Sequence, residues 1–293
     1  MKRRIREGIF AVTLSLCFVT SVHAQHPIDI ERAAAQGDYI GALTQFETMP
    51  VRIRTTSSII AAAKSAWALS LPEKAQLNFE AALKDPKITA MQRAQLLLSR
   101  AVIEYQEGKH NVSILRAEKA LAACEQECLF ASRIHLLWGQ SLASLNSHGA
   151  ADEHFTLALE TALPNEIADI SFFRGMTRLH LGKNEDARAD FEKVPLTHER
   201  TPDAIRSLAL IALEANDFEG AAFWLSKGRN EFPENFLDSW VDYALLQVAV
   251  YERDEPKVAL LTSEAQKKYP PSDPWLTIIN ATAETYFWEG RRP

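Results

Sequence analysis

The chain has 293 residues, of which 32 are basic and 38 acidic, and its formal net charge at pH 7 is −6. An acidic chain without a basic stripe is a poor candidate for a protein that binds nucleic acid or anionic lipid. This length suggests one large domain or two, unless the chain is built from repeats, which grow by addition.

Residues 1–24 predict a secretory signal peptide. A basic start (residues 2–6), a mostly apolar stretch (residues 9–22) and a small residue at Ala24 are its three parts. We expect cleavage after Ala24, which removes four basic residues and one acidic residue and leaves 28 against 37, a net charge near −9. The alternatives are a retained membrane anchor, for which about 20 apolar residues are usual, and a lipid on Cys17, which Leu16 disfavours. No later stretch approaches the length of a membrane span, so we expect no span after cleavage.

From Ile28 onward, the chain repeats one spacing: a small residue, a turn residue seven positions later, an alanine twelve later and an aromatic residue sixteen later. The clearest copies are Gly139-Asn146-Ala151-Phe155, Gly175-Gly182-Ala187-Phe191 and Ala209-Asn216-Ala221, with Leu225 in the place of the aromatic residue. Apolar residues return at helical spacing and strand signals are almost absent. The period therefore predicts stacked helical hairpins.

The expected turns between the two helices of each hairpin fall at residues of similar kind. They are Gly37, Ser70, Gly108, Asn146, Gly182, Asn216 and Asp254. Gly and Asn tolerate the left-handed backbone that closes a helix. The register of the seventh unit is the least certain, because only its Ala259 fits the pattern well.

Three segments carry a resemblance to a known family. Residues 35–46, residues 181–191 and residues 215–233 resemble the middle of tetratricopeptide repeats. The resemblance implies an all-α fold, a right-handed superhelical solenoid of about seven helical hairpins plus a C-terminal helix. The expected solenoid covers residues 25–293, with repeats at about 28–50, 51–86, 88–124, 127–164, 165–195, 200–233 and 235–270 and a terminal helix at 274–290.

Cys124 and Cys128 are the two cysteines left after the leader. Two cysteines four apart in an exported protein suggest a disulfide, which would join neighbours on one helix face or tie a turn across a helix end. Free thiols are the main alternative. A redox pair is less expected because the spacing is not that of thiol oxidoreductases, and nothing nearby supplies further zinc ligands.

The expected terminal helix is unusually apolar for the end of a solenoid. It carries Trp275, Ile278, Ile279, Tyr286, Phe287 and Trp288, whereas solenoids usually end on a polar outer face. One interpretation is a cap that covers the seventh hairpin. The other is an exposed patch that awaits another protein or another copy of the chain.

The resemblance also implies where a partner would bind, because the first helix of each hairpin lines the concave side of such arrays. The matching positions are Lys64, Trp67, Val102, Tyr105, Arg133, Gln140, Phe172, Met176, Arg206 and Leu210. We assign Val102 and Leu210 to packing and the other eight to a partner-binding groove. Trp67, Tyr105, Phe172 and Arg206 are the expected anchors, because aromatic residues and arginine dominate interface energies.

Motifs for catalysis are missing from the sequence. It has no GxGxxG, no phosphate-binding GxxxxGK[ST] and no HExxH, and His135 is expected to be a core histidine. We expect no cofactor, no metal and no enzymatic activity.

The interpretation that remains is a periplasmic scaffold that binds a protein or peptide of the cell envelope. The resemblance implies a role in assembling pili, secretion channels, polysaccharide export or outer-membrane complexes. Self-assembly through the terminal helix is the alternative, and an enzyme subunit is less expected.

Overall fold

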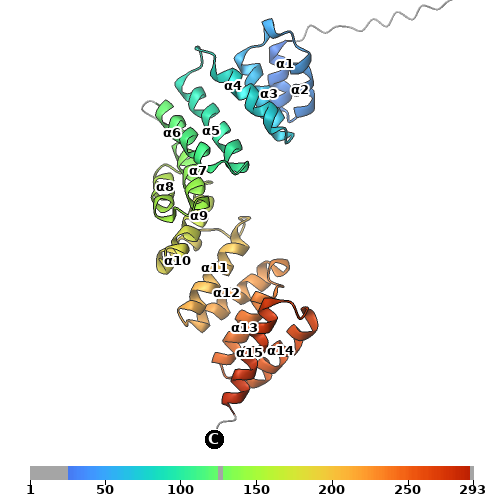
Figure 1. The fold of residues 1–293 in the computed structure, drawn as a ribbon, viewed down its shortest axis with the longest axis vertical. Helices are drawn as coiled ribbons and strands as arrows, with labels where there is room; N and C mark the ends of the chain where they lie inside the picture. Colours follow the sequence, from blue (N-terminus) through green and yellow to red (C-terminus); the bar gives the residue numbers. More distant parts are fainter. Residues whose placement is uncertain (1–25, 125–127, 291–293) are drawn as a thin grey trace, which may run out of the picture. The chain divides into compact units, whose positions relative to one another are not determined.

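The computed structural model describes residues 26–124 and 128–290, and its helices are labelled in Figure 1. The helices form two compact units that divide after Pro86. The predicted signal peptide, residues 1–24, lies outside the described residues.

The first unit contains two helical hairpins. They are α1 (Pro27–Ala35) with α2 (Tyr39–Thr48), and α3 (Thr56–Ala68) with α4 (Pro72–Leu83), joined by the 3-10 helix η1 (Val51–Ile53). The capping box of α3 shows why it begins where it does. The Thr55 hydroxyl accepts a hydrogen bond from the backbone N–H of Ser58, and the Ser58 hydroxyl accepts one from the backbone N–H of Thr55.

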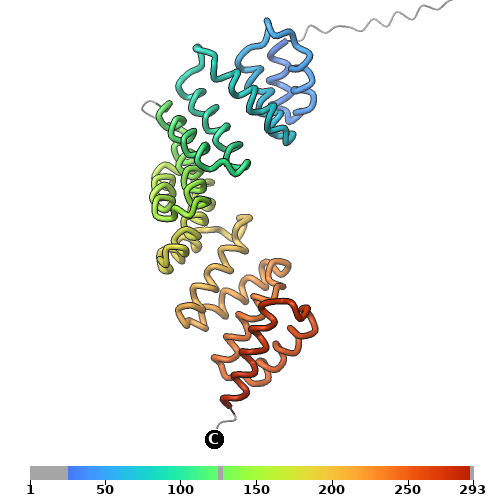
Figure 2. The backbone as a smooth tube through the Cα atoms, viewed as in Figure 1, coloured from blue at the N-terminus to red at the C-terminus, as the bar shows by residue number. Residues whose placement is uncertain are grey.

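The second unit contains five hairpins and one further helix. They are α5 (Ala90–Gln106) with α6 (His110–Ala123), α7 (Ala131–Ser144) with α8 (His148–Glu160), α9 (Ile167–His180) with α10 (Asn184–Phe191), α11 (Thr201–Glu214) with α12 (Phe218–Glu231), α13 (Ser239–Tyr251) with α14 (Glu255–Lys268), and α15 (Pro274–Glu289), with η2 (Pro233–Asn235) before α13. The tube in Figure 2 follows the chain up and down through these pairs. The described residues hold no strand. The prediction of seven helical hairpins and a terminal helix is confirmed.

Each hairpin turn contains one residue with a left-handed backbone. Six of the predicted turn residues have it, with φ between 57° and 81°. The next residue donates its N–H to a carbonyl five positions earlier, as Lys109 does to Glu104 at 2.8 Å. This bond satisfies a carbonyl that the end of the first helix would leave unpaired.

The seventh turn is one residue earlier than predicted. Arg253, not Asp254, has the left-handed backbone, with φ of 56°. Asp254 instead caps α14, because its carboxylate accepts a hydrogen bond from the backbone N–H of Lys257. The register of the second helix shifts accordingly, so Val258 is buried and Ala259 is exposed.

A small residue on the first helix lets a large residue of the second helix lie against it. A Cβ atom built on Gly139 would lie 2.7 Å from the Phe155 ring, and one on Gly175 would lie 2.9 Å from the Phe191 ring. In the seventh hairpin, at the same sixteen-residue spacing, Leu246 is fully buried at the position of Gly139 and Gly175, and Thr262 takes the position of Phe155 and Phe191. The larger residue of this pair therefore lies on the first helix and not on the second.

Buried charges join α8, α9 and α10. The fully buried Asp190 pairs with Arg174 at 2.7 Å and with Arg178 at 2.8 Å. Arg178 also pairs with Asp152, which Lys183 reaches at 2.8 Å. Burial alone would raise the pKa of Asp152, but the hydrogen bonds from Lys183 and Arg178 outweigh it and lower that pKa. The network therefore compensates charges that would be costly to bury unpaired.

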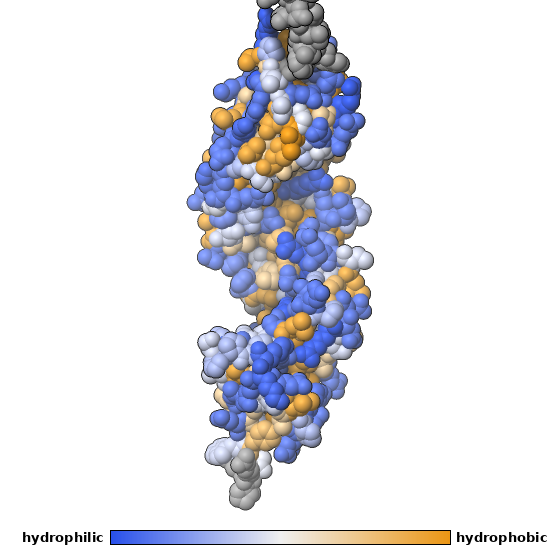
Figure 3. Space-filling model, turned by 90° about the vertical axis from the view of Figure 1, so that its right-hand side faces the viewer, coloured by the Kyte–Doolittle hydropathy of each residue, from blue (hydrophilic) through white to orange (hydrophobic). Residues whose placement is uncertain are grey.

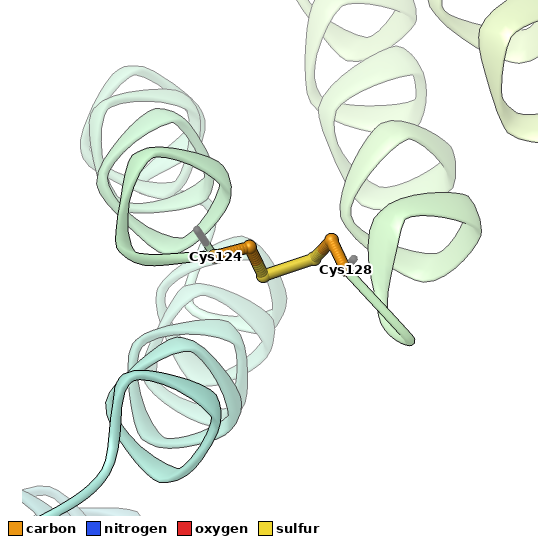
Figure 4. The surroundings of a disulfide bond; sticks show 2 residues. All are labelled: Cys124 and Cys128. Atoms are coloured by element: carbon orange, nitrogen blue, oxygen red, sulfur yellow. A yellow bond between two sulfur atoms is a disulfide. The ribbon is translucent and has the colours of Figure 1, made fainter. Parts of the chain in front are cut away.

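Cys124 and Cys128 are joined by a disulfide, with their Cα atoms 5.1 Å apart. Figure 4 shows the bond running from the end of α6 to the chain just before α7. It thus ties together two successive hairpins of the second unit. The loop that it closes is short, so its expected effect on the unfolded chain is modest.

The second unit's last helix, α15, packs on α13 and α14. Leu276, Ile279 and Ala283 are its buried residues, and they share a core cluster with Leu246 and Val258. No helix within the described ranges has the length and apolar character that crossing a membrane requires.

Candidate partner-binding site

The eight predicted groove residues all lie on first helices of hairpins, but in both units. Lys64 and Trp67 are on α3 of the first unit, where Lys64 is exposed and Trp67 half-buried. The other six lie in the second unit, on α5, α7, α9 and α11.

A cavity of about 250 Å³ in the second unit brings three of the predicted residues together: Tyr105, Gln140 and Met176. They come from three successive first helices, α5, α7 and α9, and so from three hairpins. The remaining lining residues are Ala143, Ser144, His148, Phe155, Phe173, Thr177 and His180. The cavity thus combines apolar walls with several hydrogen-bonding groups, which is the usual character of a binding pocket.

Two histidines that the sequence analysis did not single out contribute to this cavity. His148 begins α8 and His180 ends α9, and their rings stack with centroids 4.6 Å apart. The Nδ1 atom of His148 is buried without a hydrogen-bond partner among the described residues. A ligand atom placed there would satisfy it. The sequence could have indicated His180, because it lies four residues after the predicted groove residue Met176 and therefore on the same face of α9.

Phe172 was predicted as an exposed anchor, and this prediction is wrong. Its side chain is 6% exposed and belongs to a core cluster with Phe191, Ala204 and Leu208. Residues of α11 cover it, so a partner protein cannot reach the ring. Phe172 holds adjacent hairpins together instead.

Arg206 was also predicted as an anchor, but its guanidinium group is already engaged within the chain. It donates hydrogen bonds to the Asp238 carboxylate and to the Asn235 carbonyl. It also lies over the rings of Phe236, at 5.0 Å, and Trp240, at 5.5 Å. Arg206 therefore fastens α11 to the segment that leads into α13, and a partner would have to displace these contacts.

Arg133 is exposed but pairs with Glu166 at 2.6 Å, across the gap between α7 and the start of α9. Burial opposes the ionisation of Glu166, but hydrogen bonds from Arg133 and from the Leu163 backbone outweigh this and lower its pKa. The pair therefore stays charged at neutral pH, at the surface of the second unit.

A second histidine pair lies between α7 and α8. The Nδ1 atoms of His135 and His154 are 3.0 Å apart, and Trp138 stacks on His154 with centroids 4.2 Å apart. Burial, and then the neighbouring His135, lowers the pKa of His154 to about 4. Burial also lowers the pKa of His135. Both rings are therefore neutral at pH 7 and share one hydrogen bond.

Three or more histidine, cysteine or acidic side chains suited to holding a metal ion do not come together anywhere in the part of the chain that the structure describes. The second unit thus presents helix surfaces and a small cavity lined by both apolar and hydrogen-bonding side chains. Its chemistry suits binding by shape and hydrogen bonds.

Comparisons with known proteins give likenesses of structure. No protein-family model matches the chain, and no curated protein matches its sequence. Among solved structures, PilW, described as a widely conserved type IV pilus biogenesis factor, is 18% identical and has a TM-score of 0.57, over 76% of this chain and 97% of that one. A tetratricopeptide repeat protein from Parabacteroides merdae is 16% identical with a TM-score of 0.56, over 80% and 87%. PilF of Pseudomonas aeruginosa is 14% identical with a TM-score of 0.56, over 71% and 94%. The chain has the fold of the tetratricopeptide repeat proteins.

Proposed function

We propose that this tetratricopeptide-repeat chain is a non-enzymatic scaffold that holds a protein partner, and that the cavity between α5, α7 and α9 receives a side chain of that partner. The observation that carries the proposal is the meeting of Tyr105, Gln140 and Met176 at one cavity. These are positions that the family resemblance assigns to a binding face, and they come from three different hairpins.

The cavity favours a peptide or helix with one bulky anchoring side chain. Its volume of about 250 Å³ exceeds that of one large side chain, and Phe155, Phe173 and Met176 supply apolar walls. Gln140 and His148 supply hydrogen-bonding groups at the same place. Peptides that enter a repeat surface are commonly held by a few such anchors.

We further propose that the protein acts in the periplasm, in the assembly of envelope or surface machinery. The signal-peptide pattern of residues 1–24 supports export. The likeness to PilW, a type IV pilus biogenesis factor, supports a pilus among the candidate machineries. The repeat fold supports a role in binding other proteins, because the five stacked hairpins of the second unit offer an extended surface.

The cavity is tested by filling it. Gln140→Trp should block the cavity, while Leu157→Trp adds the same ring at an exposed position of α8 and serves as the control. Each protein is used to capture partners from envelope extracts, with mass spectrometry as the readout. Proteins that the wild type and the control retain, and that Gln140→Trp loses, are the expected result. Equal capture by all three proteins would remove the cavity from the proposal.

Export is tested separately. Cell fractionation followed by N-terminal sequencing should find the protein in the periplasmic fraction and beginning at Gln25. A chain that starts at Met1 and stays in the cytoplasm would contradict the proposed location and leave the cavity experiment unaffected.

A further inference from the structure

The pair of histidines between α7 and α8 combines two groups that bind transition metals. On the face drawn in Figure 3, separate orange apolar areas lie between blue hydrophilic ones, as on most protein surfaces. His135 and His154 instead bring two imidazole nitrogen atoms together, and neutral imidazole is the commonest side-chain ligand of metals. Because 19 residues separate the two histidines, no sequence motif marks the pair.

The distance within the pair fits two ligands of one ion. The Nδ1 atoms of His135 and His154 are 3.0 Å apart, and both side chains are half-buried. With metal–nitrogen bonds of about 2.0–2.1 Å, two nitrogen atoms at this separation subtend an angle of about 95° at the ion. The ion would therefore lie to one side of the line that joins the two atoms. Each ring would turn its lone pair from the other nitrogen toward the ion.

This angle and the small number of ligands favour Cu²⁺ over Zn²⁺. Neighbouring positions in the square-planar or tetragonal geometry of Cu²⁺ are about 90° apart, whereas tetrahedral zinc sites require about 110° and usually more side chains. No third histidine, cysteine or carboxylate joins the pair within residues 26–124 and 128–290, so water would complete the coordination. Cu²⁺ also has the highest affinity of the divalent first-row metals for such ligands.

Both imidazoles are available to a metal at neutral pH. Burial, and then the neighbouring His135, lowers the pKa of His154 to about 4, and burial lowers the pKa of His135. One Nδ1 carries the proton of the hydrogen bond that the rings share. When the ion binds, that ring gives up the Nδ1 proton to solvent and takes one up at Nε2, so both rings stay neutral and no net proton is released. The charge of Glu160 opposes the lowering of the His135 pKa, and the same negative charge favours a cation beside this ring.

We propose that His135 and His154 form a Cu²⁺-binding site, with their Nδ1 atoms in neighbouring positions around the ion and water in the others. The ion would cross-link α7 to α8 within one hairpin. Neither histidine lines the cavity between α5, α7 and α9. The copper site and the partner-binding cavity can therefore each be present without the other.

Trp138 provides a built-in measurement of copper binding, because its ring stacks on that of His154 with centroids 4.2 Å apart. Paramagnetic Cu²⁺ quenches the fluorescence of a tryptophan this close to it. The full chain, stripped of metal with EDTA, should lose part of its tryptophan fluorescence saturably when it is titrated with copper(II) sulfate. Electron paramagnetic resonance of the complex should show two nitrogen ligands. Trp138→Phe should lose the fluorescence change and keep the copper affinity that calorimetry measures.

Single substitutions of the two histidines identify the ligands. His135→Gln and His154→Gln should each weaken Cu²⁺ binding by at least about tenfold, because loss of a group that merely supports a metal ligand has an effect of that size. His110→Gln, at a half-buried position of α6, is the matched control and should leave the affinity unchanged. Quenching that persists in His154→Gln would place the ion elsewhere, and tighter binding of Zn²⁺ than of Cu²⁺ would contradict the geometry. Either result would overturn the proposal.

Discussion

Single residues set the distance between the two helices of a hairpin. Gly139 and Gly175 have no side chain at the points where Phe155 and Phe191 lie against them. In the seventh hairpin the bulk is on the first helix, at Leu246, and the small residue is Thr262 on the second. Packing of the hairpin therefore depends on the two positions together, because close-packed interiors respond to summed volume.

Exchange of the sizes in the fifth hairpin should reproduce this compensation. Gly175→Leu alone should destabilise by about 1–3 kcal/mol through overpacking. Phe191→Thr alone should cost about 3–5 kcal/mol, as other large-to-small core changes do. The double variant should be less destabilised than the sum, by about 0.5–3 kcal/mol. Unfolding in guanidinium chloride measures all three, and strict additivity would contradict the size-pair interpretation.

The pair His135 and His154 predicts a loss of stability in mild acid. The folded pKa of His154 is about 4, below its usual 6.5, so the unfolded chain takes up a proton that the folded chain does not. This contribution to stability is complete above about pH 6.5, falls as the pH drops toward 4 and is constant below it. The Tm of the wild type should therefore fall over this range. His154→Gln should show a smaller fall, and His26→Gln, at an exposed position before α1, should behave as the wild type.

At the level of helices, buried charges tie one hairpin to the next. Asp190 of α10 is fully buried and pairs with Arg174 and Arg178 of α9, and Arg178 continues to Asp152 of α8. Burial of an isolated charge costs several kcal/mol, so each member depends on the others. The network specifies which helix faces meet.

Removal of one member should be costly. Asp190→Ala removes the carboxylate that pairs with the buried Arg174, and we expect a loss of about 3–5 kcal/mol. Asp186→Ala, on the exposed side of the same helix, should change stability by less than about 0.5 kcal/mol. Thermal unfolding followed by circular dichroism compares the two. A similar small effect of both variants would show that the network does not stabilise the fold.

Helices and turns could be predicted from the sequence because their signals are local. Apolar periodicity located the hairpins, and six turns fell on residues with positive φ. The seventh was displaced because Asp254 and Arg253 are both polar, and only the capping bond to Lys257 decides between them. Local sequence does not report which of two adjacent residues makes that bond.

The candidate site was harder to predict because its burial depends on distant residues. Phe172 has the position of a groove residue, but Ala204 and Leu208 of the next hairpin cover it. Arg206 is held by Asp238, 32 residues later. Tyr105, Gln140 and Met176 could be placed on one face from the repeat spacing, whereas no local pattern joins His148 to His180.

For the whole molecule, the division after Pro86 indicates that the second unit has a core of its own. Five hydrophobic clusters join its helices, and none of them contains a residue of α1–α4. In repeat proteins, stability is approximately the sum of each unit and its nearest neighbours. The second unit should therefore fold alone.

A fragment of residues 87–293 tests this. It should keep the helical circular dichroism per residue of the full chain and should unfold cooperatively. A disordered fragment would show that the first two hairpins are required. The matching fragment of residues 25–86 has only two hairpins and should be marginal, since about three repeats are usually needed for stability.

The exchanged sizes at Leu246 and Thr262 have a practical consequence for anyone who recombines these modules. If two chains were joined at a point between positions 246 and 262, Leu246 and Thr262 would come from different parents. The two helices of that hairpin would then be either underpacked or overpacked. Crossover points are therefore safest in the linkers between successive hairpins. Shuffled libraries cut there should yield far more folded chimeras than libraries cut at the hairpin bends.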